Sequence, residues 1–272
     1  MLSVIVITKN EEKFLAACLE SVKWADEIII ADNGSTDKTL EIARKYTSHI
    51  FTETDHDFAN LRNKAMEKAK GDWVLYIDAD ERVMAPLREE IKALINSETF
   101  VAYALSRQNI IFGQAVSYGP YARDWMIRLL KKSAFKQWIG RVHEHAQFTG
   151  ELGYSAHSLL HLTHRDVDSF VLKSLEYSKI DAKLRLDAHH PAMSGWRFMR
   201  ILVTEIWNQG FNRRGFFGGT VGVVDSMLQA FSMFITYVRL WQLQQKPLID
   251  QKYEQIDEQL VKTNFETWTN GK

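Results

Sequence analysis

Two carboxylates, Asp78 and Asp80, stand one residue apart directly after the apolar run Trp73–Ile77. The run is too short for a helix but has the length of a strand that is buried on both faces. Ligands of open α/β sheets bind at the carboxyl ends of the strands. Carboxylate oxygens there suit Mg2+ or Mn2+ held together with substrate phosphates. An Asp-x-Asp pair also occurs in solvated turns, so the choice between a metal site and a solvated turn depends on the segments upstream.

Two further apolar runs, Leu2–Thr8 and Glu27–Ala31, also end in polar side chains. Each is followed by a segment with helical spacing, and a helix over Phe58–Lys70 is expected to end on Gly71 as its C′ residue. Strand–helix repeats of this size predict a parallel sheet with right-handed crossovers, hence an α/β fold. The polar residues after the three strands then meet at one rim: Thr8, Asn10 and Glu11; Asp32 and Ser35; Asp78 and Asp80.

The sequence lacks the glycine-rich loops that are typical of two common classes of nucleotide-binding protein. The sequence has neither a Gly-x-x-x-x-Gly-Lys loop nor a Gly-x-Gly-x-x-Gly loop, so it supports neither a P-loop ATPase nor a dinucleotide dehydrogenase. Carboxylates, amides and hydroxyls suit a base, a ribose and a metal-bridged diphosphate instead.

In four motifs the chain resembles the family-2 inverting glycosyltransferases of GT-A fold. The motifs are Val4–Glu12, Ile30–Thr39, Arg62–Ala65 leading to Gly71-Asp72, and Asp78–Glu81. Their order and spacing over about ninety residues make the resemblance specific. It implies a GT-A domain that binds a nucleotide-sugar, with Mg2+ or Mn2+ as the cofactor.

The resemblance also implies roles for individual residues. Thr8, Asn10, Glu11 and Ser35 would border the nucleotide, and Asp32 would accept hydrogen bonds from the base. Arg62 would reach the base or the diphosphate; the alternative for Arg62 is a solvated helix face. Asp78 would lie near the ribose and the metal, and Asp80 would bind the metal directly.

An inverting transfer also needs a carboxylate that takes the proton of the acceptor hydroxyl. Members of the family use a Glu-Asp pair, which this chain lacks; Val142-His143-Glu144 stands in its place and resembles a subgroup of lipopolysaccharide core glucosyltransferases. The resemblance makes Glu144 the general base, with a structural salt bridge as the alternative. His143 would orient Glu144 or contact the sugar, or else only pack. His161 would contact the diphosphate or metal, or be buried for structural reasons.

The composition changes in the last third of the chain. A helix is expected over Asp168–Leu186, an amphipathic one from Trp196, and a nearly apolar one over Val223–Leu243. The charge-free part of the last, Ser226–Val238, has 13 residues, whereas a span needs about 20. We expect it not to cross a bilayer, but to lie in the membrane interface, to cover the catalytic domain or to pair with another copy.

The totals set the remaining expectations. Lys+Arg and Asp+Glu are 34 each, so the chain has no net positive charge that would attract nucleic acid. The lone Cys18 fits a reducing compartment, and the start of the chain shows no secretion signal; the chain is expected to be cytoplasmic, with a peripheral membrane contact.

We expect a glycosyltransferase domain over residues 1–165 and a helical region over 166–272. The expected reaction moves a hexose, glucose by the resemblance, from a UDP-sugar to a glycan or glycolipid acceptor such as the lipopolysaccharide inner core. The alternatives are a peptide or polyprenyl-phosphate acceptor, or a non-catalytic nucleotide-binding scaffold.

Overall fold

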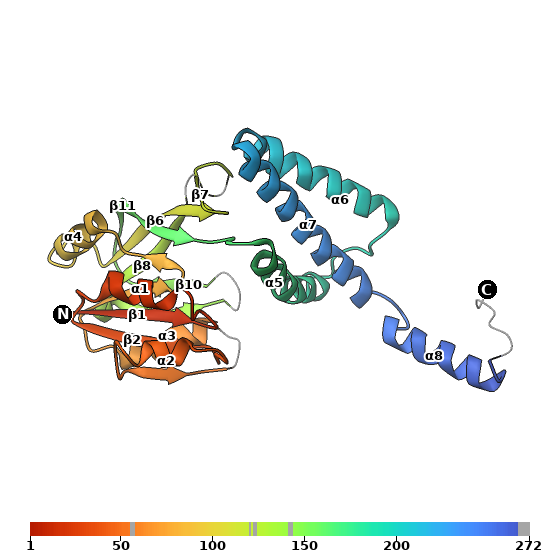
Figure 1. The fold of residues 1–272 in the computed structure, drawn as a ribbon, viewed down its shortest axis with the longest axis horizontal. Helices are drawn as coiled ribbons and strands as arrows, with labels where there is room; N and C mark the ends of the chain where they lie inside the picture. The colour runs from red at the N-terminus through yellow and green to blue at the C-terminus, as the bar shows by residue number, and fades with distance from the viewer. Residues whose placement is uncertain (55–57, 120, 122–123, 141–143, 266–272) are drawn as a thin grey trace. The chain divides into compact units, whose positions relative to one another are not determined.

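The chain forms two compact units, Met1–Arg165 and Asp166–Lys272, in a computed structural model. The structure describes residues 1–54, 58–119, 121, 124–140 and 144–265. His143 therefore lies outside the described residues. Figure 1 shows the fold and labels many of the helices and strands of both units.

The first half of unit 1 is a parallel α/β layer in which strands and helices alternate. Its elements are β1 (Leu2–Thr8), α1 (Leu15–Val22), β2 (Glu27–Asp32), α2 (Thr39–Ala43), β3 (Ile50–Thr52), α3 (Phe58–Lys68) and β4 (Trp73–Asp78). The four strands lie in the order β3-β2-β1-β4 and pair in parallel. This part confirms the predicted strand–helix repeat, although α2 is shorter than the helical spacing suggested.

The central strand β1 is buried along its whole length. Alternate side chains of a strand point to opposite faces, so Val4 and Val6 pack in one cluster with α1, while Ile5 and Ile7 pack in another with α3. Burying each such side chain contributes about 1.5–3 kcal/mol. The two clusters fix the sheet between its helices and thereby fix where β1 ends.

The second half of unit 1 extends the sheet with mixed strand directions. Its elements are β5 (Glu81–Arg82), α4 (Ala85–Leu94), β6 (Ala102–Ile111), β7 (Gln114–Val116), β8 (Trp125–Lys131), η2 (Lys132–Ala134), β9 (Phe135–Ile139), β10 (His145–Phe148) and β11 (Leu152–Leu162). β8 lies antiparallel between β4 and β6, whereas β11 runs parallel to β6. β9 and β10 form a separate two-stranded ribbon. The expected parallel pairing thus holds throughout the first four strands, whereas the second half combines the parallel pair β6–β11 with antiparallel pairs.

Gly71 has a different role from the predicted one. α3 ends at Lys68, and Gly71 is not among the described residues with positive φ. Instead, a Cβ at this position would lie 2.6 Å from the backbone nitrogen of Ser3. Glycine is therefore required here because the chain enters β4 in close contact with the start of β1.

Unit 2 is helical. It contains α5 (Val167–Asp187), α6 (Gly195–Trp207), the π-helical turn η3 (Asn208–Asn212), η4 (Gly215–Phe217), α7 (Gly219–Leu243) and α8 (Ile249–Lys262). Asp166 caps α5 by accepting from the backbone of Ser169 at 2.7 Å.

α7 is long and apolar enough, by length and composition alone, to cross a membrane, as the core helices of many soluble proteins also are. Its polar side chains, however, are engaged inside unit 2. Asp225 and Thr236 are buried, and Arg239 donates to the Ser178 hydroxyl of α5 at 2.8 Å. These contacts favour a helix that packs on α5.

Candidate active site

The strand ends of β1, β2 and β4 lie level with one another. The parallel register places Thr8 beside Asp32 and Ile7 beside Asp78. Hydrophobic packing of the strands therefore brings the predicted polar residues to one rim, because each apolar run stops at the same height.

The turn after β2 is built around Asp32, which is fully buried. Its carboxylate accepts from the backbone nitrogens of Gly34 at 3.0 Å and Ser35 at 3.1 Å, and from the Thr52 hydroxyl at 3.3 Å. Gly34 has a φ of 80°, which favours glycine. Asp32 thus shapes the loop that follows β2 at the rim.

Two neighbouring side chains are buried without a hydrogen-bond partner among the described residues. These are the hydroxyl of Thr8 and both amide atoms of Asn33. A buried polar group without a partner costs about 1–3 kcal/mol. Orphaned donors and acceptors at the ends of β1 and β2 are what a polar ligand would satisfy. Asn33 was among the strand-end residues in the sequence but was not selected as a site residue.

Asn10 and Ser35 join the loops after β1 and β2. The backbone nitrogen of Asn10 donates to the Ser35 hydroxyl at 2.9 Å, and the Asn10 carboxamide oxygen accepts from Thr36 at 2.7 Å. Asn10 has a φ of 54°, a conformation that asparagine tolerates. The next residue, Glu11, pairs with both terminal nitrogens of Arg165 at 2.8 and 3.3 Å.

A buried cluster of two arginines and two carboxylates lies behind the rim. Arg128 contacts Asp78 through both terminal nitrogens and Glu81 at 2.8 Å. Arg62 donates to Oδ1 of Asp78 at 3.2 Å, the oxygen that also accepts from Arg128 Nη1. Arg128 and Glu81 are fully enclosed, at 2% and 0% side-chain exposure, whereas the Asp78 side chain is 30% exposed, so the cluster meets solvent only through Asp78. Arg62 is buried as well, which excludes the solvated helix face considered for it.

These contacts set the protonation of Asp78 and Glu81. Burial alone would raise the pKa of Asp78, but the charges of Arg128 and then Arg62 outweigh it and hold that pKa well below its usual range. Burial raises the pKa of Glu81, which Arg128 opposes only in part. Asp78 is therefore ionised at neutral pH, and both of its oxygens already face guanidinium groups.

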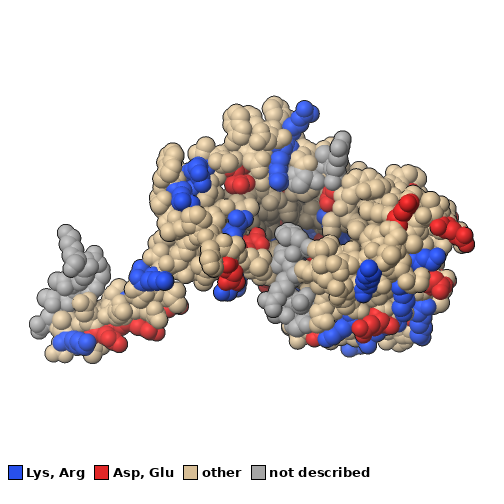
Figure 2. All heavy atoms as spheres, turned by 180° about the vertical axis from the view of Figure 1, so that it is seen from behind, with Lys and Arg blue, Asp and Glu red and all other residues tan. Residues whose placement is uncertain are grey.

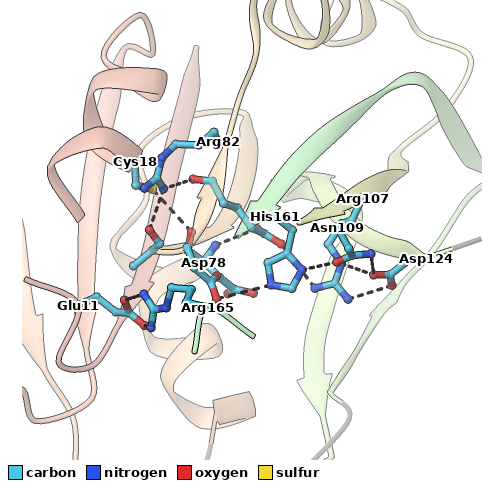
Figure 3. A network of polar contacts seen from close by, with 12 residues as sticks. Glu11, Cys18, Asp78, Arg82, Arg107, Asn109, Asp124, His161 and Arg165 are labelled. Atoms are coloured by element: carbon cyan, nitrogen blue, oxygen red, sulfur yellow. Dashed lines mark hydrogen bonds and ion pairs between the residues drawn. The ribbon is translucent and has the colours of Figure 1, made fainter. Parts of the chain in front are cut away.

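His161 is oriented by a chain of hydrogen bonds that ends at Arg107 (Figure 3). Arg107 donates to Asp124 at 2.8 and 2.9 Å, and the Asn109 amide nitrogen donates to Asp124 at 3.0 Å. The Asn109 oxygen must then face His161 Nδ1, 2.6 Å away. Because that oxygen can only accept, Nδ1 carries the hydrogen, and Nε2 of a neutral His161 carries a lone pair.

Nε2 of His161 lies 3.5 Å from a carboxylate oxygen of Asp80. A lone pair and a carboxylate oxygen at this distance repel each other unless a proton or a cation lies between them. Within the described ranges no three His, Cys, Asp or Glu side chains gather as a metal cage. Asp80 supplies the kind of carboxylate that Mg2+ or Mn2+ takes together with substrate phosphates, and the imidazole nitrogen of His161 is a ligand of the kind that transition-metal ions accept.

Glu144 directly precedes β10 and is partly buried. It belongs to the same unit as the rim, and the preceding residues, 141–143, lie outside the described part of the chain.

Sequence reasoning missed Arg128, Glu81, Asn109 and Asp124. One signal was available, since Arg128 interrupts the apolar run of β8. A charge in a buried strand requires an opposite charge or a set of acceptors. The partners themselves come from β5 and β4 and are set by the tertiary fold.

Comparisons with known proteins place this site in a family. The family described as glycosyl transferase family 2 matches residues 3–149. The lipopolysaccharide core biosynthesis glycosyltransferase LpsC of Rhizobium meliloti is 27% identical over 263 residues, covering 92% of this chain and 96% of that protein.

Solved structures resemble the chain more weakly. The crystal structure of Staphylococcus aureus TarS has a TM-score of 0.43 and 14% identity, covering 89% of this chain and 54% of that chain. Glucosyl-3-phosphoglycerate synthase from Mycobacterium tuberculosis, crystallised with Mn2+ and UDP-glucose, has a TM-score of 0.35 and 21% identity, covering 39% of this chain and 43% of that chain. The family match spans the parallel layer and the strand ends described above, and the chain belongs to glycosyl transferase family 2, with an α/β GT-A fold followed by C-terminal helices.

Proposed function

We propose that the chain transfers a hexose, glucose as the specific case, from a UDP-sugar to a saccharide acceptor with inversion at the anomeric carbon. The observation that carries this proposal is the pair formed by Asp80 and His161 Nε2, 3.5 Å apart. Both atoms suit a divalent cation, and the orphaned polar groups of Thr8 and Asn33 lie at the ends of β1, which neighbours β4, and of β2, the next strand in the sheet.

The nucleotide would lie along the ends of β1 and β2. Asp32 holds the turn that would receive the base, and within the described part of the chain its Oδ1 has a single long hydrogen bond, at 3.3 Å from the backbone nitrogen of Ser35. Thr8, Asn10, Glu11 and Ser35 would border the nucleoside. Arg62, whose guanidinium lies over the rings of Tyr76 and Trp138, has two nitrogens, Nε and Nη1, without a hydrogen-bond partner among the described residues. A diphosphate oxygen would satisfy them.

Asp80 and His161 would hold Mg2+ or Mn2+, which neutralises the charge on a departing diphosphate when bound. Asp78 has both oxygens engaged by Arg128 and Arg62. We therefore assign Asp80 to direct metal contact, with Asp78 next to it as the fixed negative charge that the ribose and the metal would meet.

Glu144 would act as the general base. In the transfer, the acceptor oxygen forms a bond to the anomeric carbon while the bond from that carbon to the phosphate oxygen breaks. The acceptor proton passes to the Glu144 carboxylate, and the electron pair leaves with UDP. A positioned base of this kind contributes about 10²–10⁴-fold to the rate. His143 is proposed to orient Glu144 or to contact the sugar.

The acceptor we propose is a glycan carried on a lipid, in the class of the lipopolysaccharide inner core. The support is LpsC, a lipopolysaccharide core biosynthesis glycosyltransferase to which the chain is similar over nearly its whole length. Such an acceptor places the protein in the cytoplasm, on the cytoplasmic face of the inner membrane.

UDP release from a panel of UDP- and GDP-sugars, with and without Mn2+, tests this proposal. We expect UDP-glucose to be hydrolysed slowly alone and rapidly with a lipopolysaccharide core acceptor. Transfer to peptides or to polyprenyl phosphate, and not to the lipopolysaccharide core, would show that the proposed acceptor is wrong. UDP binding without release in the presence of any acceptor would favour a non-catalytic scaffold.

A further inference from the structure

The outward face of α6 is an apolar stripe. Trp196, Met199, Val203 and Trp207 recur at intervals of three or four residues and are 75%, 57%, 62% and 57% exposed. The opposite face packs inside unit 2, where the Phe198 ring lies 5.7 Å from that of Phe234 on α7. The stripe is therefore the side of α6 that the rest of its unit leaves uncovered.

Aromatic contacts extend the stripe beyond the end of α6. The ring of Trp207 lies 4.7 Å from that of Phe211, and the Phe211 ring lies 6.4 Å from that of Phe217. Phe217 is 74% exposed. We call this surface the α6 ridge; it consists of Trp196, Met199, Val203, Trp207, Phe211 and Phe217. Single exposed apolar residues are ordinary, but a contiguous row of them marks an interaction surface.

Arginines flank the α6 ridge. Arg197 and Arg200 follow Trp196 by one and four residues, and Arg213 and Arg214 lie between Phe211 and Phe217. None of the four forms an ion pair with another residue in the described part of the chain, and all but the partly buried Arg197 are exposed. Over residues 195–217 the only acidic residue is Glu205, although the whole chain has balanced charges. On the face drawn in Figure 2, the helical unit is mostly neutral surface on which both basic and acidic side chains are visible.

We propose that the α6 ridge docks in the interface of an anionic phospholipid bilayer, with its rings at the boundary of the acyl chains and its arginines on lipid phosphates. Tryptophans at the membrane–water interface and basic residues beside an apolar helix face are typical of helices that lie in the plane of a membrane. α6 is about 20 Å long at 1.5 Å per residue, too short to span the hydrocarbon core.

Charge argues against a second copy of the chain as the occupant. A symmetric contact pairs the same surface of both copies. Ridge against ridge would bring eight unpaired arginines together, and like charges brought face to face repel each other. An anionic lipid surface supplies the negative charge that another ridge lacks. The inference rests on the proposed function in that a lipid-linked acceptor would be found at this surface.

Vesicle co-sedimentation of the full chain tests the inference. Vesicles of phosphatidylcholine alone are compared with an equimolar mixture of phosphatidylcholine and phosphatidylglycerol, at low and at high salt. We expect binding to the mixed vesicles that weakens at high salt. The double variant Trp196→Ser/Trp207→Ser is expected to bind at least about tenfold more weakly. Arg197→Gln/Arg200→Gln is expected to lose roughly fivefold per arginine on mixed vesicles only.

The matched control removes exposed apolar side chains from another helix of the same unit. Leu172 and Leu184 of α5 are 65% and 51% exposed, and Leu172→Ser/Leu184→Ser should bind as wild type does. Circular dichroism of each variant checks that it folds.

Three results would overturn the inference: no binding of wild type to mixed vesicles, an equal loss in the α5 control, or a dimer that Trp196→Ser/Trp207→Ser abolishes while vesicles are not bound. UDP binding, measured on the same preparation without lipid, separates this failure from failure of the proposed function.

Discussion

Replacing Arg128 with methionine removes the guanidinium that lies between Asp78 and Glu81 behind the rim. Methionine fills much of the volume of the arginine stem, so the change removes charge more than packing. It leaves Glu81, 0% exposed, with only the Arg107 guanidinium at 3.6 Å as an ion-pair partner within the described ranges. Asp78 keeps Arg62 at 3.2 Å.

The expected loss in the free energy of unfolding is about 3–5 kcal/mol at pH 8, the cost of leaving a buried ion uncompensated. With a urea m-value of about 1–3 kcal/mol/M, the unfolding midpoint should fall by at least about 1 M. An exposed ion pair provides the comparison. Arg88 contacts Glu89 at 2.8 Å with both side chains largely exposed, so Arg88→Met should cost no more than about 1 kcal/mol.

The loss should depend on pH. Burial raises the pKa of Glu81 and Arg128 opposes this, so Arg128→Met raises that pKa further. A carboxyl whose pKa is higher in the folded state binds its proton more tightly there, and stability falls as pH rises from the unfolded pKa, about 4.3, through the folded one. The lowered pKa of Asp78 contributes stability above about 3.9 in the wild type, and Arg128→Met loses part of it. Both effects make the deficit largest at pH 8 and smaller in acid.

Urea unfolding followed by near-ultraviolet circular dichroism, at pH 5 and pH 8, measures the size of the loss and the part of its pH dependence that comes from Glu81, because the contribution of Asp78 changes only at about pH 3.9 and below. Adding Glu81→Gln to Arg128→Met should restore part of the loss at pH 8, because the buried charge is then absent. A midpoint shift that is the same at both pH values, or one no larger than that of Arg88→Met, would show that Arg128 does not compensate buried charge.

Three further predictions concern the site. Asp80→Ala should lower kcat at least a hundredfold and abolish the effect of Mn2+ on UDP affinity, which kinetics and calorimetry measure; a variant that keeps the Mn2+ effect contradicts the metal assignment. Glu144→Gln should lower kcat at least a hundredfold with UDP binding unchanged, and near-normal transfer would remove the base assignment. Asp124→Leu should remove the acceptor that fixes the orientation of the Asn109 amide. Nitrogen NMR of His161 should then show a mixture of tautomers, and Mn2+ affinity should fall about 10–100-fold. An unchanged Nδ1–H tautomer would refute the proposed orientation of His161.

The sequence predicted the parallel layer because each of its strands is a short apolar run that stops at polar residues. The same feature predicted the rim, because the carboxyl ends of neighbouring parallel strands lie at the same edge of the sheet, together with the polar residues that follow them. The confirmed α/β GT-A fold follows from that repeat and from the four motifs. The roles assigned to Thr8, Asp32, Asp80 and Glu144 stay predictions.

The remaining features depend on pairings that no local pattern contains. β8 enters the sheet antiparallel between β4 and β6, and this pairing places Arg128 against Asp78. Likewise, the register of β11 on β6 pairs His161 with Asn109, which is 52 residues earlier. A lone histidine in a sequence carries no sign of such a partner. The role of Gly71 was mistaken because its close contact is with Ser3, at the start of another strand.

The most direct test of a cation held by Asp80 beside a bound diphosphate is a calorimetric titration of UDP, with and without Mn2+. Wild type and Asp80→Asn are titrated side by side, because asparagine keeps the shape of the side chain and removes its charge. We predict that Mn2+ tightens UDP binding to the wild type at least tenfold, about 1.4 kcal/mol, and has no such effect on Asp80→Asn. Binding of UDP that is equally tight with and without Mn2+, or no binding of UDP at all, would contradict the account.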